Sequence, residues 1–274
     1  MRIYLFILPL AAMLLSCGSA GESGKPMLAV TMEPYRFIVE AVAGDKWQVV
    51  SMVPKGSSPE TFDPSPGRMM TLGRCRAYFM AGGIGFEQSW GAKIAEMFPS
   101  LPMIDTSEGI ERIHDDPHLW TSPDNMSLIA RNVCNALCRL DSTDIDGYVS
   151  RLSDAETMLC AVDSTIRARL ATGADSCFVV LHPSLTYFAR LYGLRQMALE
   201  EHGKEPSASH IKHTVDEARR LGIGKIFIQA EFDKKHAESI ARELNAAIIT
   251  IDPLSYNWRG EMLNIADQLK NGKE

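Results

Sequence analysis

Short apolar runs alternate with amphipathic stretches along the chain. In the first half, residues 27–31, 47–53 and 77–81 are compact runs rich in β-branched and aromatic side chains, which is typical of buried strands. Residues 35–42 instead show the spacing of a helix. Strands that alternate with helices in this way predict parallel sheets flanked by helices.

The second half repeats the pattern, with strand-type runs at 177–181, 195–199, 225–229 and 247–251 and helical spacing at 185–192 and 234–244. We therefore predict an α/β fold of two similar parallel-sheet lobes. The expected boundaries are 27–140 for the first lobe and 174–274 for the second.

A single apolar stripe between these lobes predicts one long connecting helix over residues 141–173. Its members are three or four residues apart: Tyr148, Leu152, Ala155, Leu159, Val162, Ile166 and Leu170. Such a helix would reach about 40 Å, along the backs of both lobes, and would permit only a small hinge motion. A second helix is expected over 123–140, capped by Ser122.

The first residues have the pattern of an export signal. One basic residue precedes the apolar run Ile3–Leu15, which is too short to span a bilayer and ends at Ser16-Cys17. We predict a signal peptide over 1–16, lipid attachment at Cys17, and a tether over 17–26. The alternative is an ordinary signal peptide with an incidental cysteine; both place the mature protein outside the cytoplasm.

Charge then narrows the classes of partner. The formal net charge is −6, and removing residues 1–16 takes away one arginine and no acid, which makes it −7. An acidic chain of this kind is not expected to bind nucleic acid. A single acyl chain at Cys17 would hold the body of the protein at a membrane.

The remaining cysteines do not indicate a disulfide framework or a zinc knuckle. Their number beyond Cys17 is odd and no two have Cys-x-x-Cys spacing: Cys75, Cys134, Cys138, Cys160 and Cys177. We expect these cysteines to be small buried apolar side chains, and a single disulfide among them is the alternative.

Three proline-flanked motifs carry the candidate chemistry: Asp116-Pro117-His118-Leu119-Trp120, His182-Pro183 and Asp252-Pro253. The latter two directly follow predicted strands, at the edge where parallel sheets collect ligands. Imidazole and carboxylate are ligands for divalent transition metals, so these motifs predict a metal site between the lobes. From the first lobe, the loop 54–64 offers Glu60 or Asp63.

In these motifs the chain resembles the metal-binding lipoproteins of bacterial ABC importers, the zinc and manganese receptors of the periplasmic solute-binding class. The resemblance extends over nearly all of the mature chain, through residues 116–120, 182–194, 203–207 and 252–254. It implies two α/β lobes joined by a long helix, with one divalent metal held between them.

Position by position, the resemblance makes His118 and His182 histidine ligands and Asp252 the carboxylate ligand. Glu60 stands where the family usually has a further histidine. The expected set is thus two imidazoles and two carboxylates, with zinc first and manganese second as the bound substrate ion.

Two departures from the family pattern stand out. Glutamate and glutamine are exchanged at Gln229 and Glu231, and only His114, Asp115 and Asp116 stand where zinc-type members often have a loop rich in histidine and acids. We expect Trp120, Gln229 and Glu231 to surround the ligands without binding the metal.

The other candidate side chains are expected to lie outside the metal site. Tyr187 and Phe188 should pack behind His182. Taken alone, His118 beside a proline could be a loop histidine that is hydrogen-bonded to a backbone carbonyl group. The remaining histidines lie in polar or helical surface contexts and are not expected to bind the metal: His202, His210, His213 and His236.

These observations predict a monomeric, lipid-anchored receptor that passes a divalent metal to an ABC permease. A metal-dependent hydrolase could use the same ligands, but no His-Glu-x-x-His pairing supplies a general base, and we expect no enzyme. A scavenging or adhesin-like lipoprotein without a permease is the other alternative.

Overall fold

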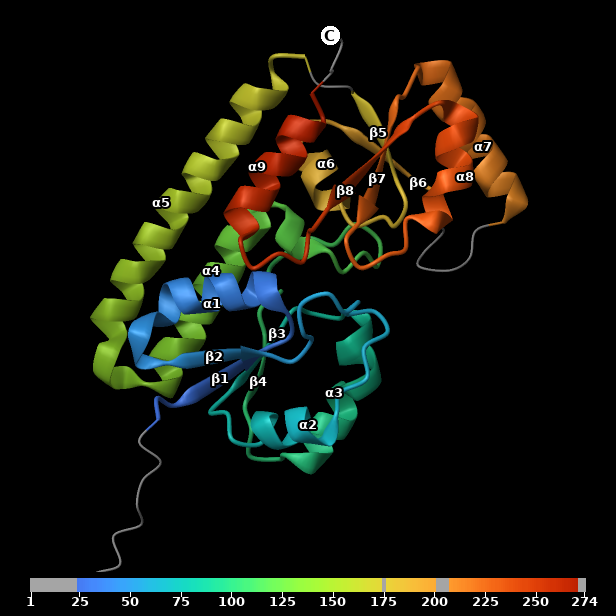
Figure 1. Cartoon of the computed structure of the whole chain (residues 1–274). Coiled ribbons are helices and arrows are strands. Elements are labelled where there is room, and N and C mark those ends of the chain that lie inside the picture. Colours follow the sequence, from blue (N-terminus) through green and yellow to red (C-terminus); the bar gives the residue numbers. More distant parts are fainter. Residues whose placement is uncertain (1–23, 174–175, 201–206, 271–274) are drawn as a thin grey trace, which may run out of the picture.

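Two four-stranded parallel sheets, each covered by helices, form the two lobes of the chain (Figure 1). This computed structural model describes residues 24–173, 176–200 and 207–270. The prediction of a two-lobed α/β fold is confirmed.

The two sheets have the same strand order. In the N-terminal lobe the order is β2 (Gln48–Ser51), β1 (Met27–Val30), β3 (Tyr78–Met80) and β4 (Met103–Asp105). In the C-terminal lobe it is β6 (Arg195–Ala198), β5 (Cys177–Val180), β7 (Lys225–Gln229) and β8 (Ala247–Ile251). Since all neighbours are parallel, the carboxyl ends of the strands in each lobe meet at one edge.

Helices cover these sheets and connect them. The N-terminal lobe and its connections contain α1 (Glu33–Ala43), α2 (Pro66–Leu72), α3 (Gly85–Met97) and α4 (Pro123–Leu140). The C-terminal lobe contains α6 (Thr186–Tyr192), α7 (Ala208–Leu221), α8 (Lys235–Leu244) and α9 (Trp258–Gln268). Short 3₁₀ turns occur at Gly44–Lys46, Leu119–Thr121 and Ser142–Asp144.

The long helix α5 (Ile145–Leu170) runs along both lobes, as Figure 1 shows. Its 26 residues correspond to about 39 Å. The prediction set its start near residue 141, but the helix proper begins at Ile145. The reason is local: the Asp141 side chain accepts the Thr143 backbone N–H and caps the 3₁₀ turn that precedes α5.

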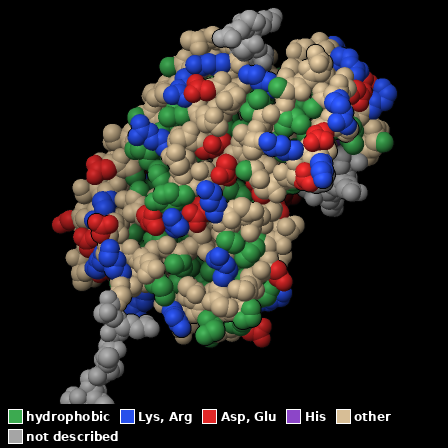
Figure 2. Space-filling view, in the orientation of Figure 1, with side chains coloured by type: hydrophobic (Ala, Val, Ile, Leu, Met, Phe, Trp, Pro, Cys, Tyr) green, Lys and Arg blue, Asp and Glu red, His purple; other side chains and the backbone are tan. Residues whose placement is uncertain are grey.

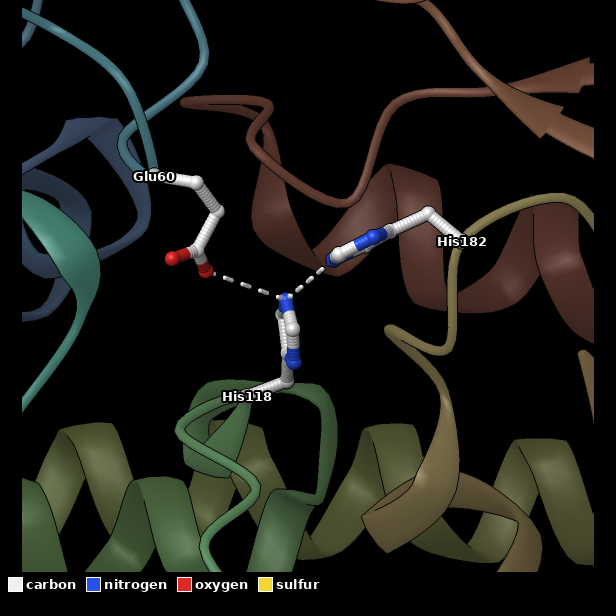
Figure 3. Close-up of side chains that lie close together, drawn as sticks. All are labelled: Glu60, His118 and His182. Atoms are coloured by element: carbon white, nitrogen blue, oxygen red, sulfur yellow. Dashed lines mark hydrogen bonds and ion pairs between the residues drawn. The ribbon is translucent and has the colours of Figure 1, made fainter. Parts of the chain in front are cut away.

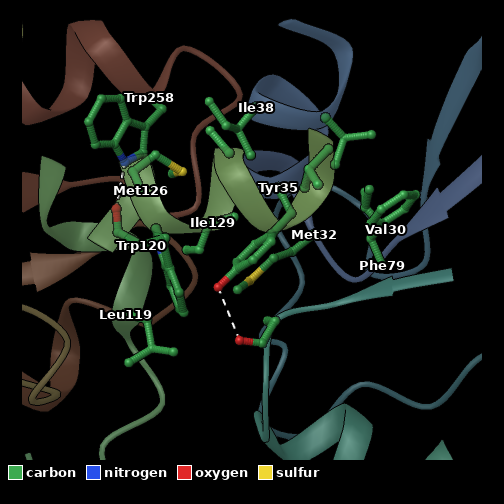
Figure 4. Packing of buried hydrophobic residues seen from close by; sticks show 14 of the residues in the cluster. Val30, Met32, Tyr35, Ile38, Phe79, Leu119, Trp120, Met126, Ile129 and Trp258 are labelled. Atoms are coloured by element: carbon green, nitrogen blue, oxygen red, sulfur yellow. Dashed lines mark hydrogen bonds between the residues drawn. The ribbon is translucent and has the colours of Figure 1, made fainter. Parts of the chain in front are cut away.

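One buried apolar cluster extends through both lobes (Figure 4). It joins Tyr35 of α1 and Phe79 of β3 to Trp258 of α9. Two indole hydrogen bonds strengthen this junction: Trp258 Nε1 donates to the Trp120 carbonyl at 2.7 Å, and Trp120 Nε1 donates to the Pro253 carbonyl at 2.8 Å. A shared core with such cross-links holds the two lobes in a fixed relation.

Several other predictions can be placed on this fold. All five cysteines of the described chain are free.

No helix among the described residues has the length and apolarity needed to cross a membrane. Cys17 and the predicted signal lie outside those residues. On the face shown in Figure 2, basic and acidic side chains are intermixed, without an extended patch of either charge.

Candidate metal site

Three of the four predicted ligands come together between the lobes (Figure 3). Glu60 lies in the connection from β2 to α2, His118 precedes the 3₁₀ turn Leu119–Thr121, and His182 follows β5. Each offers a ligand atom, and these atoms all lie within 4.8 Å of one another. His118 and His182 are buried, whereas Glu60 is half-buried.

The two imidazoles face each other through their Nε2 atoms. The distance between His118 Nε2 and His182 Nε2 is 3.3 Å, and His118 Nε2 lies 3.9 Å from Glu60 Oε1. The ring planes are inclined by 72°. The nitrogen lone pairs and the carboxylate oxygen therefore point toward a common region.

Two further carboxylates fix which nitrogen of each ring carries the hydrogen. Asp116 Oδ1 lies 2.8 Å from His118 Nδ1, and Glu200 Oε2 lies 2.8 Å from His182 Nδ1. Because an ionised carboxylate only accepts, each Nδ1 must donate. In the neutral imidazoles, both Nε2 atoms are then free to bind a cation.

Asp116 is itself held firmly in place. Its carboxylate also accepts the backbone N–H of His118 at 2.8 Å. Burial raises the pKa of Asp116, but the hydrogen bonds from His118 and Thr186 oppose that rise, and the pKa lies below its usual range. Tyr187, whose hydroxyl donates to the Asp116 carbonyl at 2.8 Å and accepts from the Ile113 N–H at 3.1 Å, does more than pack behind His182.

Glu60 is positioned by the start of α3. The Gly85 N–H donates to Glu60 Oε2 at 3.2 Å, and the Phe86 N–H donates to the Pro59 carbonyl at 2.8 Å. A Cβ atom added at Gly85 would lie only 2.8 Å from Glu60 Oε2 and would also clash with the Glu60 backbone. The close approach of these two segments therefore requires glycine at residue 85.

The alternative ligand from the same loop lies elsewhere. Asp63 is exposed, and its Oδ1 accepts the Trp90 indole N–H at 2.9 Å. Of the two acids that the sequence offered in this loop, the structure brings Glu60 to the histidines.

Aromatic side chains form walls of the small cavity at the site. Trp120 and Phe232 both line it. The Trp120 ring lies 5.2 Å from that of His118, and Phe232 stacks on His182 with 5.4 Å between ring centroids. Water is thus kept from one side of each imidazole.

Asp252, the fourth predicted ligand, lies outside the three-residue group. Its carboxylate accepts the Leu254 backbone N–H, and its own N–H donates to Glu261 Oε1 at 2.8 Å. Burial raises the pKa of Asp252, and the positive charge of Lys55 opposes that rise. Ligation by Asp252 therefore stays a prediction that the resemblance supplies.

The exchanged pair Gln229 and Glu231 takes two different places. Gln229 is buried, and its Nε2 donates to the His182 carbonyl at 2.7 Å and to Ser184 Oγ at 2.6 Å. Glu231 lines the cavity itself. Burial, aided by the negative charge of Asp252, raises the pKa of Glu231 to about 7.

The remaining histidines are not in the three-residue group. His213 is exposed on α7, and His210 Nε2 lies 3.0 Å from the Ala198 carbonyl. His202, residues 203–206 of the family-like motif and the side chain of His236 lie outside the described part of the chain.

Glu200 is the partner that sequence reasoning missed. It follows β6, next to β5 in the sheet, and pairs with a histidine 18 residues earlier. The signal available was its position: an acid just beyond the end of a strand adjacent to the one that carries His182.

Comparison with known proteins shows the family of this chain. The family of the periplasmic component A of zinc-uptake complexes matches residues 28–272. The metal ABC transporter substrate-binding lipoprotein FimA of Streptococcus parasanguinis is 24% identical over 264 residues, covering 86% of this chain and 83% of the relative. The manganese ABC transporter substrate-binding lipoprotein PsaA of Streptococcus anginosus is 22% identical over 272 residues, covering 90% and 85%.

A solved structure of a family member has the same fold. A crystal structure of ZnuA superimposes with a TM-score of 0.85 at 30% sequence identity, and the match covers 89% of this chain and 98% of that chain. The whole two-lobed body is therefore shared.

Proposed function

We propose, for a chain that belongs to the family of the periplasmic component A of zinc-uptake complexes, that Glu60, His118 and His182 hold the transported metal. The chain is a metal-binding substrate-binding protein of an ABC importer. The bound divalent ion is its substrate and is passed on unchanged.

The observation that carries the ligand assignment is the orientation of the two imidazoles. Both Nδ1 atoms face carboxylates, so two lone pairs point at each other across 3.3 Å beside an acidic oxygen. Lone pairs at this distance repel unless a cation lies between them. The site is therefore built for a positive ion.

The donor set favours transition metals over calcium or magnesium. Imidazole nitrogen suits zinc, and mixed nitrogen and carboxylate donors suit manganese as well. We propose zinc as the first substrate and manganese as the second. The relatives support both: the matched family is one of zinc uptake, and the Streptococcus anginosus relative is named for manganese.

The importer implies a permease partner in the membrane. We propose that the chain works as a monomer outside the cytoplasm, attached through a lipid at Cys17, as the lipoprotein names of its relatives suggest. The family is one of substrate-binding proteins rather than enzymes, so we do not propose hydrolysis at the site.

Calorimetric titration of metal-free protein with Zn²⁺ and Mn²⁺ tests this function. We expect one tight site per chain, because the ligand atoms form a single converging group. No tight site, or two, would contradict the proposal.

The same titration applied to Glu60→His tests the choice of metal. Replacing a hard oxygen with a borderline nitrogen should raise zinc affinity relative to manganese. An unchanged ratio of the two affinities would place Glu60 outside the coordination sphere.

A further inference from the structure

Asp116, which orients the His118 ring, is itself held by the first two residues of α6. This helix follows the His182 loop in the C-terminal lobe and packs against the 3₁₀ turn that comes after His118 (Figure 1). The Tyr187 hydroxyl donates to the Asp116 carbonyl at 2.8 Å, and the Thr186 hydroxyl bonds to the Asp116 carboxylate. The loop of one histidine is thus attached to the helix that begins directly after the loop of the other.

The direction of the Tyr187 hydrogen bonds is fixed by its partners. The Ile113 N–H can only donate, and it lies 3.1 Å from the phenol oxygen, so the single phenol proton is left for the Asp116 carbonyl. Tyr187 is buried, with 1% of its surface exposed. Its hydroxyl therefore ties two points of the loop before His118 to the C-terminal lobe.

The Thr186 hydroxyl is oriented by the neighbouring strand. Gln196 Oε1 accepts the Leu185 N–H at 2.7 Å, which fixes the amide, and Gln196 Nε2 donates to Thr186 Oγ1 at 3.0 Å. Because Thr186 Oγ1 accepts this bond, its own proton is free to donate to the Asp116 carboxylate. A chain of hydrogen bonds therefore runs from β6 through Thr186 and Asp116 to the His118 ring.

Asp116 passes this constraint to His118 at two points. Its Oδ1 faces the ring Nδ1 and also accepts the backbone N–H of His118, both at 2.8 Å. Rotation of the Asp116 side chain would therefore release the ring and the backbone together. A ligand has to be held within about 0.5 Å of its binding geometry, so the metal affinity depends on such contacts.

On the basis of the proposed metal-binding function, we propose that Thr186 and Tyr187 are positioning residues for His118. They hold Asp116 in place from the C-terminal lobe, so the lobe that carries His182 also orients the imidazole that faces it. The two histidines then form one prearranged pair, whereas Glu60 is held by α3 of the N-terminal lobe.

Zn²⁺ affinities of the full chain, measured by competition with a chelator, test the assignment. Tyr187→Phe and Thr186→Val each abolish one hydroxyl, and we expect about a threefold to tenfold loss of affinity for each. Thr186→Ser keeps the hydroxyl and should bind as wild type does. An affinity within about twofold of wild type in either Tyr187→Phe or Thr186→Val would overturn the inference.

Tyr192→Phe is the matched control for these variants. It removes a hydroxyl from the same helix, but this hydroxyl bonds to Asp163 of α5 at 3.0 Å and not to the loop of His118. We expect its Zn²⁺ affinity to equal that of wild type. A loss as large as that of Tyr187→Phe would mean that α6 acts only through its general stability, and would overturn the inference.

A double-mutant cycle shows whether the two residues act through Asp116. Asp116→Ala removes the carboxylate that orients His118, and we expect about a 10- to 100-fold loss of affinity. Adding Tyr187→Phe or Thr186→Val to Asp116→Ala should cause less than about a twofold further loss. A merely structural role would give the same loss in both backgrounds, and such additivity would overturn the inference.

These experiments separate this inference from the proposed function. If wild-type protein binds neither Zn²⁺ nor Mn²⁺, the function itself fails. If wild type binds and His118→Ala does not, while Tyr187→Phe and Thr186→Val bind as wild type does, only the assignment of the two positioning residues fails.

Discussion

The two lobes share one strand order, but the acid that follows the third strand has different hydrogen-bond partners in each lobe. Glu87 follows β3, and its carboxylate accepts N–H groups of Ala81, Gly82 and Gly83 and the Thr31 hydroxyl. Glu231 follows β7 and receives none of these contacts. The first acid is fully satisfied by its own lobe, whereas the second is left facing the cavity.

The two acids also differ in position, since Glu87 lies in the first turn of α3 and Glu231 lies in the loop directly after β7. Burial raises the pKa of Glu87, and the hydrogen bonds from Gly83, Thr31, Ala81 and Gly82 oppose that rise. Glu87 thereby orders the turn that leads to Gly85, which in turn contacts Glu60. In the N-terminal lobe the acid shapes a loop, whereas in the C-terminal lobe the acid lines the cavity.

The largest expected effect tests whether both lobes contribute equally to the metal affinity. Each supplies one buried imidazole, so His118→Ala and His182→Ala should each weaken Zn²⁺ binding on the order of a hundredfold. Competition titration measures this, with His213→Ala on the exposed face of α7 as the control. A loss confined to one of the two variants would show that the metal belongs to one lobe.

The carboxylates behind the imidazoles should give the next largest effect. Asp116→Asn and Glu200→Gln each replace an acceptor that fixes the Nδ1–H tautomer, and we expect losses of about 10- to 100-fold. Asp115→Asn is the matched control, since Asp115 is exposed beside Asp116. Equal affinity of Asp116→Asn and Asp115→Asn would show that the tautomer is fixed by other means.

A smaller effect should follow from disturbing the loop of Glu60 without changing a ligand. Gly85→Ala places a methyl group against Glu60, whereas Gly91→Ala, in the same helix, meets no atom within 4 Å. We expect Gly85→Ala to lower Zn²⁺ affinity by about threefold to tenfold and Gly91→Ala to leave it unchanged. Identical affinities in the two variants would mean that α3 does not position Glu60.

The sequence predicts the parts of this molecule that local patterns encode. Strand-type runs locate the sheets, and the proline-flanked His118 and His182 mark the loops that meet. The pairing of Glu200 with His182 is absent from any local pattern, because only the adjacency of β5 and β6 brings them together. Helix α7 could have been found, since Ser207 caps its start and Gly222 follows its end.

Asp252 and Glu231 show the limit of arguing from position. Both follow strands and both are acids, so the sequence alone ranks them by family resemblance. Their difference lies in the side-chain contacts: the Asp252 carboxylate accepts the Leu254 N–H and lies near the charge of Lys55, whereas Glu231 lines the cavity. Such a choice is decided by tertiary packing, which composition and spacing do not record.

The last prediction concerns the stability of the metal-free protein and applies the contrast between Glu87 and Glu231. Burial raises the pKa of Glu231 from its ordinary value of 4.5 to about 7. A raised pKa favours the protonated folded state, so this group's contribution to stability is fully present below about pH 4.5 and is lost as pH rises to about 7.

Glutamine at residue 231 does not titrate, so Glu231→Gln should unfold as wild type does near pH 4.5 and be more stable than wild type at pH 8. The difference is at most about 3.5 kcal/mol, from roughly 1.4 kcal/mol for each unit of pKa. Urea unfolding of the two metal-free proteins across this range measures it, with Glu238→Gln as an exposed control. If the wild-type and Glu231→Gln curves stay parallel from pH 4.5 to 8, the Glu231 carboxylate is satisfied in the folded protein, and the contrast between the lobes is lost.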